Sequence, residues 1–295
     1  MVAHRRWVIL PRMTAVGVRR ARGPVVAALV VLLLAGCADG SKARELQQSP
    51  LPLGGTWRSG LFVEGYGPQG LGPKATAAPS PTGSATSGTD ATLDDPMQKI
   101  LAPLGLTAAD VTNGYRVDLV EDGTDLMKPT LGFCAKDYPS EEAREARRRL
   151  VLVGPSGEKP GILSEAVLYT TPKAASQALD ELRTATATCD ATVAIDTGDA
   201  KLTITQTPIT GIDLSGFVGP SSRVVIASTL TNTTTGTSAT LMTAYQTRGR
   251  VLVALYFQNA DGQAFTDEQR TAFALLGKKF ASRLGALDPA VADAG

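Results

Sequence analysis

Short segments in which apolar residues alternate with polar ones, or follow one another, recur through residues 115–257. Turn-forming residues bound most of these segments, and a period of two predicts β-strands. Arg248 and Gly249, which separate the last two segments, predict a hairpin. The predicted strands are 115–120, 131–134, 150–153, 163–170, 201–206, 223–231, 239–246 and 251–257.

Helical spacing occurs in fewer places. Thr171 followed by Pro172 is typical of a helix start, and Thr266 with Gln269 has the pattern of a capping box. Shorter helices are predicted from residue 94 to about 104 and from Ser140 onward. The apolar stripes of the two longer helices are Ala175, Leu179, Leu182 and Cys189 in the first, and Phe273, Leu276, Phe280 and Leu284 in the second.

Strands in runs, joined largely by hairpins and with helices between them, predict an α+β domain, in which helices pack on a central antiparallel sheet. We assign this single domain to residues 94–286 and a flexible tail to residues 287–295. The domain is near the usual upper size for one hydrophobic core.

The first 36 residues have a different pattern. Residues 1–36 contain six arginines and no acidic residue, and all six arginines precede an apolar run at 25–34. The end of this run leads into Leu34-Ala35-Gly36-Cys37. These are the parts of a secretory signal peptide, and the run is shorter than the roughly 20 residues that span a bilayer. The last four residues resemble a bacterial lipobox, which predicts cleavage before Cys37 and acylation of that cysteine, including palmitate. An ordinary signal peptide followed by a buried cysteine is the alternative.

The predicted location is therefore the extracytoplasmic face of the cell membrane, to which the acyl chains on Cys37 attach the protein. Translation could start at Met1 or Met13, because the arginines at 19–22 already supply a basic segment. The paired arginines lack a twin-arginine context, which favours the general export route.

Residues 37–93, after the cleavage site, are rich in Pro, Gly, Ser and Thr. Such a composition cannot bury enough apolar surface to fold, so we predict a disordered tether between the lipid anchor and the domain. Residues 65–70 match G-x-G-x-x-G, but no strand precedes them and Pro68 interrupts them. We interpret that match as chance.

Removal of the signal peptide changes the charge and the chemistry of the chain. The full chain has 29 basic and 28 acidic residues, and loss of residues 1–36 leaves 23 against 28. A mildly acidic mature protein gives no support for a nucleic-acid partner. The only histidine, His4, is also lost, which excludes Ser-His-Asp mechanisms and the usual zinc or haem sites. We expect no enzyme, no cofactor and no metal, although carboxylate-pair chemistry stays open.

The three cysteines divide into an anchor and a pair. With Cys37 acylated, Cys134 and Cys189 remain, and an even pair in an oxidising compartment predicts one disulfide. Two free thiols or a metal-binding pair are the alternatives.

A basic cluster at Arg144, Arg147 and Arg148 is a candidate site for an anion such as phosphate. The alternative, which we favour, is a solvated helix face on which neighbouring acids pair with the arginines at i,i+3 or i,i+4: Glu141, Glu142 and Glu145.

Some of these residues also suggest a family. Thr-Leu-Gly-Phe-Cys at 130–134, then Tyr-Pro-Ser-Glu at 138–141 and Arg144-x-x-Arg147-Arg148, resemble a motif of actinobacterial lipoproteins, to which 167–170 and the Ala-rich helix before Cys189 add. These proteins are similar to the extracellular sensor domain of mycobacterial PknH-type receptor kinases. Over residues 97–285 the resemblance implies an α+β domain with a central antiparallel sheet, a cleft and one or two disulfides. The kinase sensor domain carries two, and this chain has cysteines for one.

The leading functional hypothesis is a non-catalytic, sensor-like module with a cleft for an unidentified cell-envelope ligand or partner. It rests on the predicted lipid anchor, the tether, the disulfide-linked domain and the absence of histidine from the predicted mature chain. A structural or assembly lipoprotein that acts through protein–protein contacts is the alternative. An enzyme that uses carboxylates, for example on glycans, comes third.

Overall fold

The described part of the chain forms an α+β domain built on one antiparallel sheet. In this computed structural model it comprises residues 93–111, 114–136, 138–157, 161–189, 192–196, 201–259 and 262–294. The signal peptide, Cys37 and the tether predicted above lie outside these residues. The strands are β1 (Arg116–Leu119), β2 (Arg144–Val153), β3 (Ile162–Tyr169), β4 (Thr192–Asp196), β5 (Lys201–Gln206), β6 (Arg223–Asn232), β7 (Ser238–Arg248) and β8 (Val251–Asn259).

The helices are of two kinds, α-helices and short 3₁₀ helices. The α-helices are α2 (Pro96–Leu101), α3 (Pro172–Thr188), α4 (Asp267–Gly285) and α5 (Pro289–Ala292). The 3₁₀ helices are η1 (Ala108–Asp110), η2 (Phe133–Ala135), η3 (Pro139–Ala143) and η4 (Pro220–Ser222).

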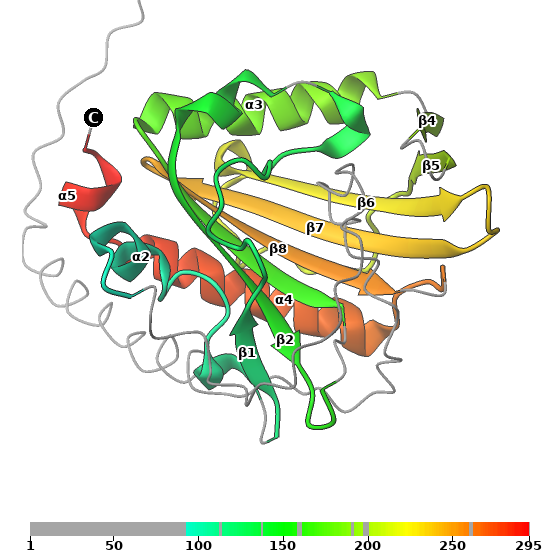
Figure 1. The fold of residues 1–295 in the computed structure, drawn as a ribbon, viewed down its shortest axis with the longest axis horizontal. Coiled ribbons are helices and arrows are strands. Elements are labelled where there is room, and N and C mark those ends of the chain that lie inside the picture. The colour runs from blue at the N-terminus through cyan, green and yellow to red at the C-terminus, as the bar shows by residue number, and fades with distance from the viewer. Residues whose placement is uncertain are drawn as a thin grey trace, which may run out of the picture. The chain divides into compact units, whose positions relative to one another are not determined.

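The sheet has the strand order β1-β2-β3-β8-β7-β6-β5-β4, and every neighbouring pair is antiparallel. β2–β3, β4–β5, β6–β7 and β7–β8 are neighbours in both sequence and space, which confirms the predicted α+β class. One pairing is far from local, because β3 pairs with β8 and sets Ile162 opposite Phe257. β8 comes last among the strands along the chain and lies in the middle of the sheet (Figure 1).

Helices cover both faces of the sheet, α3 on one side and α4 on the other (Figure 1). β8 shows the consequence. Its odd-numbered residues pack in the cluster that contains α4 and α2, and its even-numbered residues pack in the cluster that contains α3. A strand buried on both faces loses the polar alternation of a surface strand, so 251–257 reads as a continuous apolar run.

Local signals in the sequence define the two long helices. The hydroxyl of Thr171 accepts a hydrogen bond from the amide of Ala174 at the start of α3, and Pro172 occupies its first turn. Thr266 and Gln269 form the predicted capping box of α4. The predicted apolar stripe of α4 is fully buried: Phe273, Leu276, Phe280 and Leu284.

The structure differs most from the sequence prediction at residues 139–149. The helix predicted from Ser140 is only the short 3₁₀ helix η3, and β2 already begins at Arg144. The prediction was wrong because a run of charged residues rarely lies inside a buried strand. Here Arg147 of the strand bonds to Glu165 and to the carbonyl of Asp125, which are distant in the sequence. A local sequence pattern does not indicate such contacts.

Smaller differences occur elsewhere. Residues 131–134, predicted as extended, lead into η2, where Cys134 has a positive φ of 61°. α2 ends at Leu101 rather than near residue 104, and β4 was not predicted. The C-terminal residues predicted as a flexible tail contain α5, in which Ala292 is buried and accepts a hydrogen bond from the amide of Arg250.

Candidate functional site

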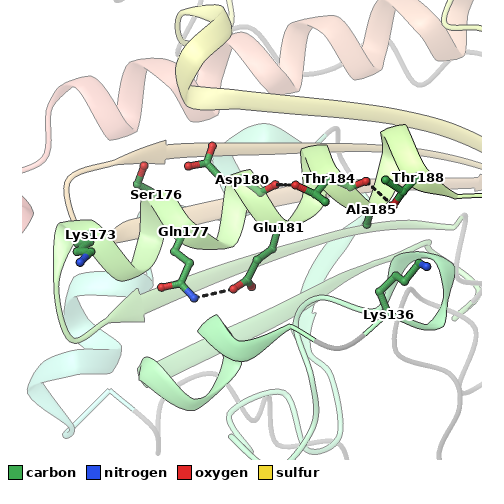
Figure 2. Close-up of a pocket in the computed structure, with 9 residues that line it drawn as sticks. All are labelled: Lys136, Lys173, Ser176, Gln177, Asp180, Glu181, Thr184, Ala185 and Thr188. Atoms are coloured by element: carbon green, nitrogen blue, oxygen red, sulfur yellow. Dashed lines mark hydrogen bonds between the residues drawn. The ribbon is translucent and has the colours of Figure 1, made fainter.

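A groove of about 550 Å³ follows the outer side of α3 (Figure 2). We call it the α3 groove. Its lining comes from every turn of α3 and from one residue that follows η2. The lining residues are Lys136, Lys173, Ser176, Gln177, Asp180, Glu181, Thr184, Ala185 and Thr188.

The amphipathic sequence of α3 explains why its outer side is polar. Its inner stripe is buried against the sheet and consists of small or branched apolar residues: Ala174, Ala175, Ala178, Leu179, Leu182 and Ala185. The small alanines let the helix lie close to the strands. Most of the hydroxyl, amide and charged residues between them line the groove, whereas Arg183 donates to the carbonyls of Pro220 and Ser221 instead.

Glu181 connects the groove to η3. Its carboxylate accepts hydrogen bonds from the hydroxyl of Ser140 at 2.6 Å and from the Ser140 amide at 3.2 Å. The side-chain amide of Gln177, one turn earlier, donates to the same carboxylate at 2.7 Å (Figure 2). These bonds hold η3 against α3, and they occupy most of the acceptor capacity of Glu181.

Other polar groups of the groove differ in how they are engaged. The hydroxyls of Thr184 and Thr188 donate to carbonyls one turn earlier in α3, so each keeps lone pairs for an outside donor. Asp180 forms an ion pair with Arg183 at 2.6 Å. Lys173 lies at one end of the groove and Lys136 at the other (Figure 2).

A disulfide between Cys134 and Cys189 fixes one end of the α3 groove. It joins the C-cap of α3 to η2, with 6.0 Å between the two Cα atoms. Lys136 follows one cysteine by two residues, and Thr188 directly precedes the other. The predicted pairing is confirmed, and the alternatives of free thiols or a metal-binding pair do not apply.

A buried ion pair lies between β2 and β3, beneath the segment that precedes η2. The Nε atom of Arg147 donates to Oε1 of Glu165 at 2.8 Å, and both side chains are at most 1% exposed. Thr130 and Tyr256 also donate hydroxyl hydrogen bonds to Glu165. Burial raises the pKa of Tyr256 well above its ordinary value, so this hydroxyl is a donor and not a base.

Arg144 and Glu141 form a second ion pair, with 3.1 Å between Nη2 and Oε2. Glu141 also accepts hydrogen bonds from the amides of Thr130 and Leu131. Burial raises the pKa of Glu141 to about 7, although Arg144 and the two amides act in the opposite direction. The carboxyl group of Glu141 therefore titrates near neutral pH.

The structure separates the arginines of the candidate anion site. Arg144 and Arg147 converge on segment 125–130 and donate to its carbonyl groups. Arg148 lies near Gln98 of α2, at 3.5 Å. Anion binding by these residues stays a prediction.

The helix-face alternative is wrong in its geometry, because Arg144, Arg147 and Arg148 lie in a strand. One of its pairings, between Glu141 and Arg144, is present. Glu145 instead forms an ion pair with Arg250 at 2.8 Å.

Sequence reasoning missed both the α3 groove and the role of Glu165. Glu165 does leave a signal, because it is a lone acid inside the apolar strand 162–169. A buried acid needs a cationic partner, and the neighbouring strand carries three consecutive arginines. The groove left no comparable signal, since exposed polar residues on a helix are ordinary.

Within the described residues, no helix is long and apolar enough to cross a membrane, and no group of acids, cysteines or histidines could hold a metal ion. The lining of the α3 groove offers hydroxyl, amide, ammonium and carboxylate groups, which can form hydrogen bonds or ion pairs with a polar ligand.

The sequence matches no family model and no curated protein. Among solved structures the chain is similar to the extracellular domain of PknH from Mycobacterium tuberculosis, with 12% identity and a TM-score of 0.40. That similarity covers 63% of this chain and 96% of the other.

Proposed function

We propose that this protein is a lipid-anchored, extracytoplasmic, sensor-like binding module, which is not catalytic and whose α3 groove receives a polar ligand of the cell envelope. The observation that carries the proposal is the groove itself. Its volume of about 550 Å³ falls in the range of small-molecule sites. Its lining supplies hydroxyl, amide, ammonium and carboxylate groups.

The proposed location rests on the N-terminal sequence and is supported by the disulfide. Leu34-Ala35-Gly36-Cys37 resembles a lipobox, and a disulfide in the folded domain suits an oxidising compartment outside the cytoplasm. A flexible tether of ~55 residues would average roughly 40 Å from end to end. That reach would let the domain meet ligands within the envelope while its anchor stays in the membrane.

The test is a thermal-shift screen of the purified protein against soluble muropeptides, glycans and short peptides. A ligand of the α3 groove should raise the melting temperature of the wild type and have little effect on Thr184→Trp, because the indole would obstruct the groove. Ser282→Trp is the matched control, because Ser282 is exposed on α4, on the opposite face of the sheet. If no compound acts, or if every active compound also stabilises Thr184→Trp, the proposal fails.

A second candidate function is an assembly lipoprotein that acts through protein–protein contacts. One observation favours it: Met127 is 87% exposed, next to Leu126 at 37%. Arg144 and Arg147 hold the backbone of this turn by its carbonyls, so the apolar tip is presented on a fixed backbone. A photoreactive residue in place of Met127, activated in intact cells, should capture a defined partner protein, whereas the same residue at exposed Thr235 should not.

A further inference from the structure

The charged groups of the α3 groove are not equally available to a ligand. Asp180 is paired with Arg183 at 2.6 Å, and Glu181 accepts three hydrogen bonds from Ser140 and Gln177. In the part of the chain that the structure describes, no carboxylate forms an ion pair with the ammonium groups of Lys136 and Lys173. The uncommitted charges of the groove are therefore cationic.

The two lysines lie at opposite ends of the groove (Figure 2). Lys173 is in the first turn of α3, where the helix dipole adds positive potential. Lys136 lies near the last turn, on the segment that the disulfide ties to Cys189. At 1.5 Å per residue, the path along α3 from Lys173 to Ala185 is roughly 18 Å. The disulfide contributes to the position of Lys136, since it ties the segment that carries this lysine to the end of the helix.

The groups between the lysines have a different character. Ser176, Gln177 and Thr184 are neutral and can donate or accept hydrogen bonds. The carboxylate of Glu181 also lies in this middle part (Figure 2). Negative charge at the centre of the groove repels a chain that is anionic along its whole length, but leaves its two ends open to anions.

We infer that the α3 groove binds an extended polar ligand that carries an anionic group at each end and neutral hydrogen-bonding groups between them. This inference rests on the proposed function and adds the chemistry of the ligand. It requires both lysines together, because a ligand with one anionic end would leave the other lysine unused.

The probe is an acetylated and amidated heptapeptide with aspartate at each end and five serines between. At about 3.4 Å per residue its two carboxylates are roughly 20 Å apart when extended. Chemical-shift changes in the ¹⁵N-labelled full chain report binding. A second peptide has phosphoserine at both ends and separates phosphate from carboxylate recognition. A third has asparagine at both ends, and a fourth has seven aspartates.

The expected result is that at least one of the two end-charged peptides shifts the amides of α3 and binds more weakly as salt rises. The double variant Lys136→Gln/Lys173→Gln should weaken binding about tenfold, since it removes both of the exposed ion pairs that the ends of the peptide would form. Lys99→Gln is the control, because Lys99 is exposed on α2, on the other face of the sheet. The peptide of seven aspartates should bind more weakly than the end-charged peptide.

Three results would overturn the inference: equal binding of the asparagine-ended peptide, unchanged binding by the double lysine variant, or strongest binding by the heptaaspartate. If neutral compounds bind and are blocked by Thr184→Trp while the end-charged peptides do not bind, the inference fails and the proposed function stands. If the groove binds nothing in either experiment, both fail.

Discussion

Arg147 of β2 and Glu165 of β3 form a diagonal ion pair, since Glu165 lies opposite Arg149 in the register. The distance between Nε and Oε1 is 2.8 Å, and neither side chain has appreciable contact with solvent. Their strands are neighbours in the sheet, and β3 also pairs with β8. The ion pair therefore lies near the middle of the fold. Arg147 additionally donates to the carbonyls of Asp125 and Lys128, so the pair also fixes the turn that follows β1.

Replacing one partner of this pair should be costly. Glu165→Gln leaves a buried guanidinium without its countercharge, and we expect the free energy of unfolding to fall by roughly 3–5 kcal/mol. Urea denaturation measures it. Asp118→Asn, which removes the exposed pair with Arg116, should cost less than about 1 kcal/mol. The double variant Arg147→Met/Glu165→Leu should recover only part of the loss, because the hydroxyls of Thr130 and Tyr256 and the carbonyl of Asp125 lose hydrogen-bond partners. A double variant less stable than Glu165→Gln would contradict the argument.

Removing the disulfide should weaken the domain and disorganise one end of the α3 groove. The bond closes a loop with a sequence separation of 55, for which chain entropy gives about 4 kcal/mol as an upper figure. We expect Cys134→Ser/Cys189→Ser to lose about 2–4 kcal/mol in a denaturant titration. Amide exchange should rise around Lys136 and the last turn of α3 before it rises in α4. Equal acceleration in both helices would show that the bond has no local role.

Glu141 should make stability depend on pH near neutrality. Its folded-state pKa of about 7 lies above the 4.5 of an unperturbed glutamate, so the folded protein binds the proton more tightly than the unfolded chain. The free energy of unfolding should therefore rise as pH falls from above 7 towards 4.5. The full shift corresponds to about 3 kcal/mol.

Other carboxylates also titrate below pH 5, so the measurement is a difference between variants. The free energy of unfolding of the wild type minus that of Glu141→Gln should increase as the pH is lowered from 8 to 5.5. The exposed neighbour Glu142→Gln is the control and should give a constant difference. A constant difference for Glu141→Gln as well would mean that Arg144 and the amides of Thr130 and Leu131 outweigh burial.

Cys37 should carry the lipid. Mass spectrometry of the mature protein from membranes is expected to find a chain that begins at Cys37 and carries acyl groups. Cys37→Ser should abolish the modification and release the protein from the membrane fraction. An unmodified Cys37, or a mature chain that still contains residues 1–36, would refute the predicted anchor.

The sequence was sufficient for the elements whose signals are local. The capping box at Thr266 and the start of α3 at Thr171 depend on neighbouring residues, and both appear as predicted. β2 was misread because its arginines are stabilised by Glu165 and by the carbonyls of segment 125–130. Those contacts exist only after the sheet has formed.

The residues of the candidate site also differ in whether the sequence alone could predict them. Cys134 and Cys189 could be paired by elimination among three cysteines, without knowledge of the fold. The α3 groove could not be predicted, because it depends on long-range contacts: the disulfide ties the segment of Lys136 to α3, and Ser140 of η3 donates to Glu181. Neither residue has a sequence neighbour that indicates the site.

The central place of β8 in the sheet determines the order in which this protein can fold. β1, β2 and β3 on one side, and β4 to β7 on the other, are joined through β8, which becomes available only when residues 251–259 have been made. The contact between β3 and β8 spans a long stretch of chain, and such pairings form slowly. The two sides of the sheet therefore come together only after the C-terminal part of the chain has been made.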